Sequence, residues 1–437
     1  MSIQKIFTYY VVKFVFGWIY MERLVISGGC QLNGEIEIGS SKNAILPIIA
    51  ATILTKGKVV LHKVPNISDV KKMLAIIESL GGLVQWSESD IIIDNSNIDN
   101  FEISSDLTSG IRSSIFILGP LIAMYKKAKV AYPGGCDIGS RPIGIHLSGL
   151  RELNVKIVEE YGFIDCEGFS MKPKFIHLDF PSVGATENLI MASVLHHGET
   201  ILNNVAKEPE VVDLINFINK MGGKIEGAGT STLRIVGVKR LNGIDYTPIG
   251  DRIIAGTYMI ASAITRGKVE LSNIKYEYVL SLIDKLKKSG CNIEFFGGKI
   301  LVESFARPKS CSFDTGVYPG FPTDLQPQLS VLTTVAKGTS MITENLFETR
   351  FRHFSELAKM GAMVECRGRT AIVRGVKELY GTEVDSFDLR GGASMVLAGL
   401  IAKGRTVVNN IEYIDRGYSS IEGQLQSLGA DIIRINR

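Results

Sequence analysis

Apolar and polar positions along the chain recur with a period of about seventy residues. Each copy has a glycine, a stretch of alternating apolar and polar residues, a segment with helical apolar spacing, and a glycine-rich end. Clear copies begin at Gly57, Gly198, Gly267, Gly338 and Gly404, at intervals of 141, 69, 71 and 66 residues. A degenerate copy near Lys127 divides the first interval into 70 and 71. The pattern therefore predicts six units.

Each unit is expected to contain a half-buried strand, a surface helix and a closing strand. A second segment, apolar on nearly every side, precedes each unit. These segments span residues 40–57, 109–127, 182–198, 251–267, 323–338 and 389–404. Segments that are apolar all round form buried helices, so we expect six interior helices. Five carry Ser, Thr or Asp close to their start, as N-caps do, and Asp388 stands just before the sixth.

Six βαβαββ-like units divide naturally into two α/β domains of three, because 437 residues exceed one ordinary hydrophobic core. Buried helices whose N-termini converge between two such domains create a cleft of positive potential without a large net charge. An anionic small ligand is therefore favoured. A repeat-built binding scaffold without chemistry is the alternative at this point, because a fold does not imply a function.

Composition narrows the class of protein. Apolar residues make up 45% and charged residues 21%, as in a globular protein. The net charge is only +3 and no basic run with interleaved aromatic residues occurs, which argues against nucleic acid as a partner. The six cysteines include no CxxC pair and no Cys/His cluster with zinc-ligand spacing. We therefore expect no metal, and a reducing cytoplasmic location.

The first twenty residues differ from the rest. Residues 6–20 read IFTYYVVKFVFGWIY, which is apolar but short for a bilayer span and interrupted by Lys13. The segment also lacks the small-residue cleavage site of a signal peptide. We interpret residues 1–20 as an extension outside the fold and expect no stable membrane insertion. A peripheral membrane anchor remains the alternative.

Charged residues at the starts of the interior helices are the first candidates for chemistry. Lys42 with Asn43, Arg112, Asp324 and Arg390 hold such positions, and Arg141, Arg350 and Arg416 lie in loops. Any one of them alone is typical of a helix cap or a solvated side chain. An arginine at a helix N-terminus opposes the helix dipole, however, and an anionic ligand would supply its partner.

Cys136 is the cysteine with the most reactive setting. It lies in YPGGCDIGSRP, where three glycines and a proline within three residues on either side indicate a flexible loop. Arg141 follows five residues later and would favour the thiolate. The other five cysteines occupy strand-like or apolar contexts, where a thiol is typically a small buried hydrophobe.

Nine motifs occur in the order seen in the UDP-N-acetylglucosamine 1-carboxyvinyltransferase family, and the chain resembles that family from Met21 to its C-terminus. The motifs are GSSKNAILPI, IRSSIFILGPL, PGGCDIGSRPIGIHLSGL, SVGATEN, AKEPEVVDL, FPTDLQPQ, FETRF, DLRGGASMVLAG and IDRGY. The resemblance implies the two-domain inside-out α/β barrel of enolpyruvyl transferases. It implies a first domain of residues 42–249 and a discontinuous second domain of residues 21–41 plus 250–437.

The resemblance also implies transfer of an enolpyruvyl group from phosphoenolpyruvate to UDP-N-acetylglucosamine, without cofactor or metal. Cys136 would give a proton to phosphoenolpyruvate and Asp324 would accept one from the sugar hydroxyl, with Lys42 and Arg416 also catalytic. The residues implied for phosphoenolpyruvate are Lys42, Asn43, Arg141, Arg390 and Arg416. Those implied for the nucleotide sugar are Arg112, Arg141, Pro142, Ile143, Gly144, Ile145, Ser182, Val183, Gly184, Asp324 and Leu346.

Two other functions remain open. Transfer to shikimate 3-phosphate uses the same fold and chemistry, but that related family lacks the PGGC loop cysteine. A catalytically silent relative that binds a UDP-sugar and regulates a partner is disfavoured because Cys136, Asp324 and the arginines are all present. Gly144 and Ile254 stand where many family members carry acidic residues, and neither change removes an implied catalytic group. No pattern identifies a protein partner.

Overall fold

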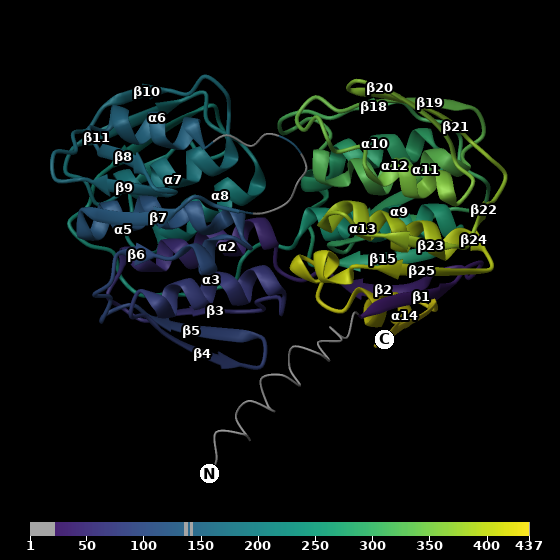
Figure 1. The fold of residues 1–437 in the computed structure, drawn as a ribbon, viewed down its shortest axis with the longest axis horizontal. Helices are drawn as coiled ribbons and strands as arrows, with labels where there is room; N and C mark the ends of the chain where they lie inside the picture. The colour runs from purple at the N-terminus through teal and green to yellow at the C-terminus, as the bar shows by residue number, and fades with distance from the viewer. Residues whose placement is uncertain (1–21, 135–138, 140–142, 437) are drawn as a thin grey trace, which may run out of the picture.

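The computed structural model describes residues 22–134, 139 and 143–436. The predicted extension of residues 1–20 and the candidate residues Cys136, Arg141 and Pro142 lie outside the described residues. Figure 1 shows two lobes side by side. One core of buried apolar residues runs from Ala44 to Tyr246, and the other combines residues 24–38 with residues 253–432. We call these the first and second lobe.

The first lobe carries three four-stranded sheets, in the orders β14-β3-β5-β4, β6-β7-β9-β8 and β10-β11-β13-β12. Their strands are β3 (Val59–Leu61), β4 (Leu83–Ser87), β5 (Asp90–Asp94), β6 (Glu102–Ile103), β7 (Lys127–Ala131), β8 (Lys156–Glu160), β9 (Phe163–Glu167), β10 (Phe175–His177), β11 (Glu199–Asn203), β12 (Ile225–Glu226), β13 (Thr232–Val236) and β14 (Asp245–Tyr246).

The second lobe repeats this arrangement in the orders β16-β17-β15-β2, β18-β19-β21-β20 and β23-β25-β1-β26, with a small additional pair β22-β24. Its strands are β1 (Arg23–Ser27), β2 (Asn33–Glu37), β15 (Lys268–Ser272), β16 (Asn292–Phe296), β17 (Lys299–Glu303), β18 (Phe313–Asp314), β19 (Thr339–Thr343), β20 (Met363–Arg367), β21 (Thr370–Arg374), β22 (Leu379–Tyr380), β23 (Glu383–Asp385), β24 (Ala402–Lys403), β25 (Arg405–Asn409) and β26 (Asp431–Ile435).

One pairing scheme recurs in all six four-stranded sheets. One edge strand pairs parallel with its neighbour, that neighbour pairs antiparallel with the next strand, and the next strand pairs antiparallel with the other edge strand. The predicted six units are therefore present. Strand β1 from the start of the chain pairs antiparallel with both β25 and β26 near its end, so the two ends of the chain complete one unit. This pairing holds the N-terminal strands in the second lobe.

Three interior helices pack in each lobe, and their sides are almost wholly buried, as their unbroken apolar sequences predict. They are α2 (Lys42–Ala51), α5 (Leu118–Tyr125) and α7 (Val183–Ser193) in the first lobe, and α9 (Arg252–Thr265), α11 (Gln326–Val335) and α13 (Leu389–Ile401) in the second. The amphipathic outer helices are α3 (Ser68–Ser79), α6 (Gly144–Glu152), α8 (Pro209–Lys220), α10 (Leu280–Lys288), α12 (His353–Lys359) and α14 (Ile421–Ser427).

Two interior helices begin differently from the prediction of one continuous helix each. The 3-10 helix η2 (Arg112–Ile117) precedes α5, and η4 (Thr323–Leu325) precedes α11. Pro120 and Pro327 lie in the first turns of α5 and α11, where a missing backbone N–H costs no intrahelical bond. Side-chain caps are also fewer than predicted, because only Ser182, Asp251 and Asp388 accept hydrogen bonds from their helices.

The chain passes between the lobes twice, and the two crossings lie against each other. Ser40 and Gly250 form an antiparallel bridge. The Ser41 amide donates to the Ile249 carbonyl at 2.7 Å, and the Asp251 amide donates to the Gly39 carbonyl at 2.9 Å. The starts of α2 and α9 are thereby held side by side, although more than two hundred residues separate them.

The buried carboxyl of Asp213, near this crossing, should make the free energy of unfolding depend on pH. Asp213 on α8 accepts hydrogen bonds from the Tyr246 hydroxyl at 2.6 Å and the Ile249 amide at 3.1 Å. Burial raises the pKa of Asp213 from 3.8 to about 6. The protonated form is thus favoured in the folded protein, so this stabilisation is complete below about pH 4 and is lost as the pH rises through about 6.

We expect Asp213→Asn to remove up to about 3 kcal/mol of this pH-dependent change in the free energy of unfolding. Denaturant unfolding at about pH 4 and about pH 7 measures it, with Asp245→Asn, at an exposed aspartate of β14, as the control. A difference between wild type and Asp213→Asn that is the same at both pH values would contradict the expectation.

Candidate active site

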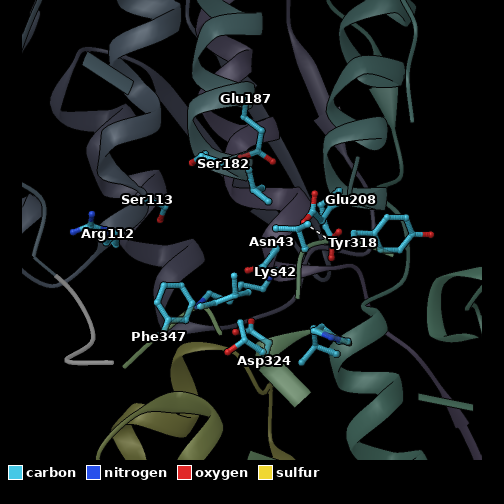
Figure 2. A pocket seen from close by; sticks show the side chains of 18 of the residues that line it. Lys42, Asn43, Arg112, Ser113, Ser182, Glu187, Glu208, Tyr318, Asp324 and Phe347 are labelled. Carbon is cyan, nitrogen blue, oxygen red and sulfur yellow. Dashed lines mark hydrogen bonds between the residues drawn. The ribbon is translucent and has the colours of Figure 1, made fainter. Parts of the chain in front are cut away.

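A cavity of about 580 Å³ is lined by residues of both lobes, and it is reached by the starts of α2, α7, α9 and α13 and by the 3-10 helices η2 and η4 that precede α5 and α11. Figure 2 shows Lys42 and Asn43 near its centre, Asp324 below them and Glu187 above. The helix starts that line it contribute Lys42, Asn43, Arg112, Ser113, Val183, Gly184, Arg252, Ile253, Thr323, Asp324, Leu389 and Arg390. The expected convergence of the buried helix N-termini is therefore present.

Asp251 ties the two lobes together at the edge of this cavity. One carboxylate oxygen accepts from the amides of Ile253 at 2.8 Å and Ile254 at 3.0 Å and caps α9. The other accepts from the Lys42 amide at the start of α2, at 3.0 Å. One buried carboxylate thus satisfies orphan N–H groups of two helices from different lobes, which fixes where the Lys42 side chain begins.

Two cations that the family resemblance implies for phosphoenolpyruvate, Lys42 and Arg416, share one carboxylate. Lys42 Nζ lies 2.7 Å from Asp69 Oδ2, and Arg416 Nε lies 3.0 Å from Asp69 Oδ1. Asp69 stands in the first turn of α3 in the first lobe, whereas Arg416 ends the 3-10 helix η5 (Ile411–Arg416) of the second. This group bridges the lobes at the cavity.

Burial and charge act against each other in this group. Burial, together with Arg390 and Arg416, lowers the pKa of Lys42 even though Asp69 opposes the change. Burial acts to raise the pKa of Asp69, but the two cations hold it below its ordinary value. Asp69 therefore stays ionised, and the group carries an excess of positive charge that suits an anion.

Asp324 forms the centre of a second group with two arginines. Arg350 Nη2 lies 2.9 Å from Asp324 Oδ1, and Arg390 Nη2 lies 3.1 Å from Asp324 Oδ2. Burial acts to raise the pKa of Asp324, but Arg390 and Arg350 hold it well below its ordinary value. Among the described residues, the buried Arg390 Nη1 and Arg350 Nε have no hydrogen-bond partner. Buried donors of this kind favour an oxygen-rich ligand.

An acidic group lines the cavity elsewhere. Glu210 accepts from Arg252 Nε at 2.9 Å, and Glu208 accepts from the Tyr318 amide at 3.5 Å. Glu187 is fully buried, and within the described part of the chain neither of its carboxyl oxygens has a hydrogen-bond partner. Burial, reinforced by Glu210 and Glu208, raises the pKa of Glu187 well above its ordinary value. Burial and the neighbouring carboxylates therefore favour the protonated form of Glu187.

Most candidate residues from the sequence lie together in this cavity. Those that line it are Lys42, Asn43, Arg112, Ile145, Ser182, Val183, Gly184, Asp324, Leu346, Arg390 and Arg416. Ile143 and Gly144 lie at the start of α6 next to Ile145, outside the cavity lining. Cys136, Arg141 and Pro142 fall outside the described residues.

Sequence reasoning missed several residues of the cavity. Asp69 looks like any acidic residue in the first turn of a helix, and only the fold brings Arg416 to it across 347 positions. Glu208 and Glu210 belong to the motif AKEPEVVDL, which was noted without a role. His146, in PIGIHLSGL, carried no signal that separated it from a core histidine.

The described residues contain neither a membrane-spanning helix nor a metal-binding cluster. No described helix is long and apolar enough to cross a membrane. Likewise, no cluster of three or more His, Cys, Asp and Glu side chains suited to a metal ion occurs within residues 22–134, 139 and 143–436.

Solved structures with the same architecture are enolpyruvyl transferases. The enolpyruvyl transferase NikO from Streptomyces tendae matches with a TM-score of 0.85 at 23% identity, covering 96% of this chain and 100% of that one. An EPSP synthase from Acinetobacter baumannii matches with a TM-score of 0.72 at 17% identity, covering 95% and 100%. At these identities the likeness concerns the fold, and it confirms the predicted two-domain α/β architecture.

Relatives found by sequence share much more identity with this chain than those solved structures do. The profile of the EPSP synthase (3-phosphoshikimate 1-carboxyvinyltransferase) family matches residues 26–425. UDP-N-acetylglucosamine 1-carboxyvinyltransferase 2 of Caldanaerobacter subterraneus subsp. tengcongensis is 49% identical over 416 residues, which cover 95% of this chain and all of that protein. The UDP-N-acetylglucosamine 1-carboxyvinyltransferase of Geobacter metallireducens is 44% identical over 415 residues, with the same coverage. With this fold and this near full-length identity, the chain belongs to the enolpyruvyl transferase family, among the UDP-N-acetylglucosamine 1-carboxyvinyltransferases.

Proposed function

We propose that this protein transfers the enolpyruvyl group of phosphoenolpyruvate to the 3′-hydroxyl of UDP-N-acetylglucosamine and releases phosphate. The observation that carries the proposal is the 44–49% identity, over about 95% of the chain, to relatives of that name. The cavity supports it, because it holds paired cations that suit a phosphate and a carboxylate.

The reaction is an addition followed by an elimination. The sugar oxygen bonds to C2 of phosphoenolpyruvate while the C3 methylene takes up a proton, which gives a tetrahedral adduct. Loss of phosphate from C2 and of a proton from C3 then restores the double bond. In our proposal Cys136 supplies the proton to C3, and Asp324 takes the proton of the 3′-hydroxyl. This chemistry requires an acid that protonates C3 and a base that deprotonates the hydroxyl attacking C2.

The arginines around Asp324 make its strength as a base depend on whether phosphoenolpyruvate is bound. Arg390 and Arg350 hold the pKa of Asp324 well below its ordinary value, which makes the carboxylate a weak base. The phosphate and carboxylate of phosphoenolpyruvate would offset these cations and strengthen it. This coupling favours proton removal only when both substrates are bound.

The two-pronged geometry of Arg416 gives a testable prediction. Its Nε and Nη2 reach the two oxygens of Asp69 at 3.0 and 3.3 Å, a fork that a lysine cannot reproduce. We expect Arg416→Lys to weaken phosphoenolpyruvate binding by about 1–3 kcal/mol, or roughly five- to 150-fold, and to leave affinity for UDP-N-acetylglucosamine nearly unchanged.

Steady-state kinetics with each substrate varied in turn measures this effect. Arg367→Lys, at an exposed arginine of β20, serves as the matched control. Equal weakening toward both substrates would mean that Arg416 supports the fold or the contact between lobes, and its assignment to phosphoenolpyruvate would be withdrawn.

Phosphate release tests the proposed function directly. The purified protein receives phosphoenolpyruvate with UDP-N-acetylglucosamine in one reaction and with shikimate 3-phosphate in another. Release only in the first supports the proposal, whereas release only in the second assigns the alternative acceptor. Binding of UDP-N-acetylglucosamine without phosphate release in either reaction would identify a silent regulatory relative.

For the cell, we infer a role in the first committed step of peptidoglycan precursor synthesis, in the cytoplasm. Growth, cell shape and division would then depend on this activity, and an epoxide that alkylates the loop cysteine would act as an antibiotic. The names of the relatives support the transferase assignment. Depletion of the protein should cause lysis with loss of peptidoglycan, and normal wall synthesis after depletion would contradict the inference.

A further inference from the structure

A buried carboxylate behind the cavity joins separate segments of the second lobe. Glu344 follows β19 directly and is 1% exposed. Its Oε2 accepts a hydrogen bond from the Thr323 hydroxyl at 2.9 Å. Its Oε1 accepts from the amides of Leu346 at 2.9 Å and Phe347 at 3.1 Å, and from the Thr315 hydroxyl at 2.8 Å. Four donors from three stretches of the chain therefore meet at one side chain.

Two of the joined segments carry residues of the candidate active site. Thr323 begins η4 and precedes Asp324, the proposed base. The Phe347 amide begins a turn, and its carbonyl accepts from the Arg350 amide at 3.2 Å. These four residues line the cavity, whereas Glu344 lies outside its lining. Glu344 thus supports both segments from behind.

The contacts of Glu344 form a closed ring with an ion pair of the cavity. Arg350 Nη2 lies 2.9 Å from Asp324 Oδ1. On the other side of the ring, Glu344 holds the start of η4 through Thr323 and the turn that leads to Arg350 through Phe347. A shift of either segment would stretch a bond of this ring. Glu344 thereby helps to determine how the proposed base lies against its arginine.

The turn alone does not account for a glutamate at this position. A side chain that only accepts from the amides two and three positions ahead can be Ser, Thr, Asp or Asn. A buried carboxylate is costly unless donors surround it. The extra length of Glu344 provides the bond to Thr323, 21 positions earlier in the chain. The position therefore favours a side chain that reaches η4.

We propose that Glu344 is a positioning residue for the proposed reaction, which through its bond to Thr323 holds Asp324 in the orientation that receives the proton of the sugar hydroxyl. The inference rests on the proposed function for the reaction that Asp324 serves. Glu344 acts through Asp324 and touches no substrate, because it lies outside the cavity lining.

Two substitutions separate the reach of Glu344 from its charge. Glu344→Asp keeps the carboxylate but is one methylene shorter, so it can still cap the turn and no longer reaches Thr323. Glu344→Gln keeps the length, and its N–H can donate to the Thr323 hydroxyl, which also accepts. We expect Glu344→Asp to lower kcat roughly ten- to a hundredfold, the scale of misplacing a catalytic group by about 1 Å, and Glu344→Gln to keep most of the activity.

Steady-state phosphate release measures kcat and both KM values. In Glu344→Asp the KM for phosphoenolpyruvate should change little, because Asp69 holds Lys42 and Arg416. Glu365→Asp, at an exposed glutamate of β20 in the same lobe, is the matched control and should behave like wild type. Circular dichroism confirms that each variant is folded. A wild-type kcat in Glu344→Asp would overturn the inference.

A double-mutant cycle distinguishes positioning from support of the fold. If Glu344 acts through Asp324, then Glu344→Asp should add little to the loss of rate in Asp324→Asn. A residue that only stabilises the fold would lower the residual rate again by the full factor, and that result would contradict the inference.

Crystal structures of the two variants test the positioning without turnover. We expect the 2.9 Å distance between Asp324 Oδ1 and Arg350 Nη2 to be kept in Glu344→Gln and to lengthen in Glu344→Asp. If wild type releases no phosphate, the proposed reaction fails, and a lengthened pair still retains Glu344 as the residue that positions Asp324. An unchanged pair in Glu344→Asp overturns the inference, whatever the activity.

Discussion

Cys136→Ala is expected to lower the rate of phosphate release by about a hundredfold or more, the scale of losing a general acid. The proposed reaction needs a proton at C3 of phosphoenolpyruvate, and alanine has none to give. Cys136→Asp, which supplies another ionisable proton, should retain part of the activity. The rate is measured at saturating concentrations of both substrates, so that a change in affinity does not enter.

Cys366→Ala is the matched control, because Cys366 is an exposed cysteine on β20 of the second lobe. It should keep the wild-type rate. Mass spectrometry after treatment with an epoxide should find the adduct on Cys136 and none on Cys366. Wild-type turnover in Cys136→Ala would exclude the acid role, and a Cys136→Asp variant as slow as Cys136→Ala would show that the side chain acts by something other than proton transfer.

Asp324→Asn should reduce turnover by at least about a hundredfold. Asparagine keeps the shape of the side chain but removes both the proton acceptor and the counter-charge of Arg350 and Arg390, which are each 3% exposed. Because its pKa is held well below the ordinary value, Asp324 stays ionised throughout the neutral range. In the pH profile of kcat/KM, which reports the free enzyme, its titration should therefore leave no acid limb between about pH 5 and 8.

Asp314→Asn, at an exposed aspartate of β18 in the same lobe, serves as the control and should behave like wild type. Calorimetry with UDP-N-acetylglucosamine separates chemistry from binding. If Asp324→Asn binds more weakly but turns over normally at saturation, Asp324 is a positioning residue and another group is the base.

Much of the architecture was predictable because local apolar patterns that repeat along the chain determine it. The six-unit period and the six buried helices follow from apolar spacing alone, since a helix with no polar side has to lie inside. The same patterns placed Lys42, Arg112, Asp324 and Arg390 at helix starts, which meet in one cavity. The resemblance in nine motifs predicted the family that the comparisons confirm.

The beginnings of two helices were not predictable at this level. A 3-10 turn and an α-helical turn have almost the same apolar spacing over four residues, so η2 and η4 look like parts of the helices that follow them. Ser41 also matches the pattern of a capping residue, yet its side chain makes no capping bond. Such differences depend on the packing around each turn.

By itself, the sequence determined which residues carry charge and which helices are buried, because both depend on residue type and on neighbours a few positions away. Only the tertiary structure decided which charges pair. Asp69 holds Lys42 and Arg416 together, and Asp324 holds Arg350 and Arg390, across as many as 347 positions. Asn188 likewise meets Gly119, Ile115 and His146 only because the fold brings them into one core. Coulomb and hydrogen-bond interactions act over a few ångströms of space, and only the fold converts distant positions into such distances.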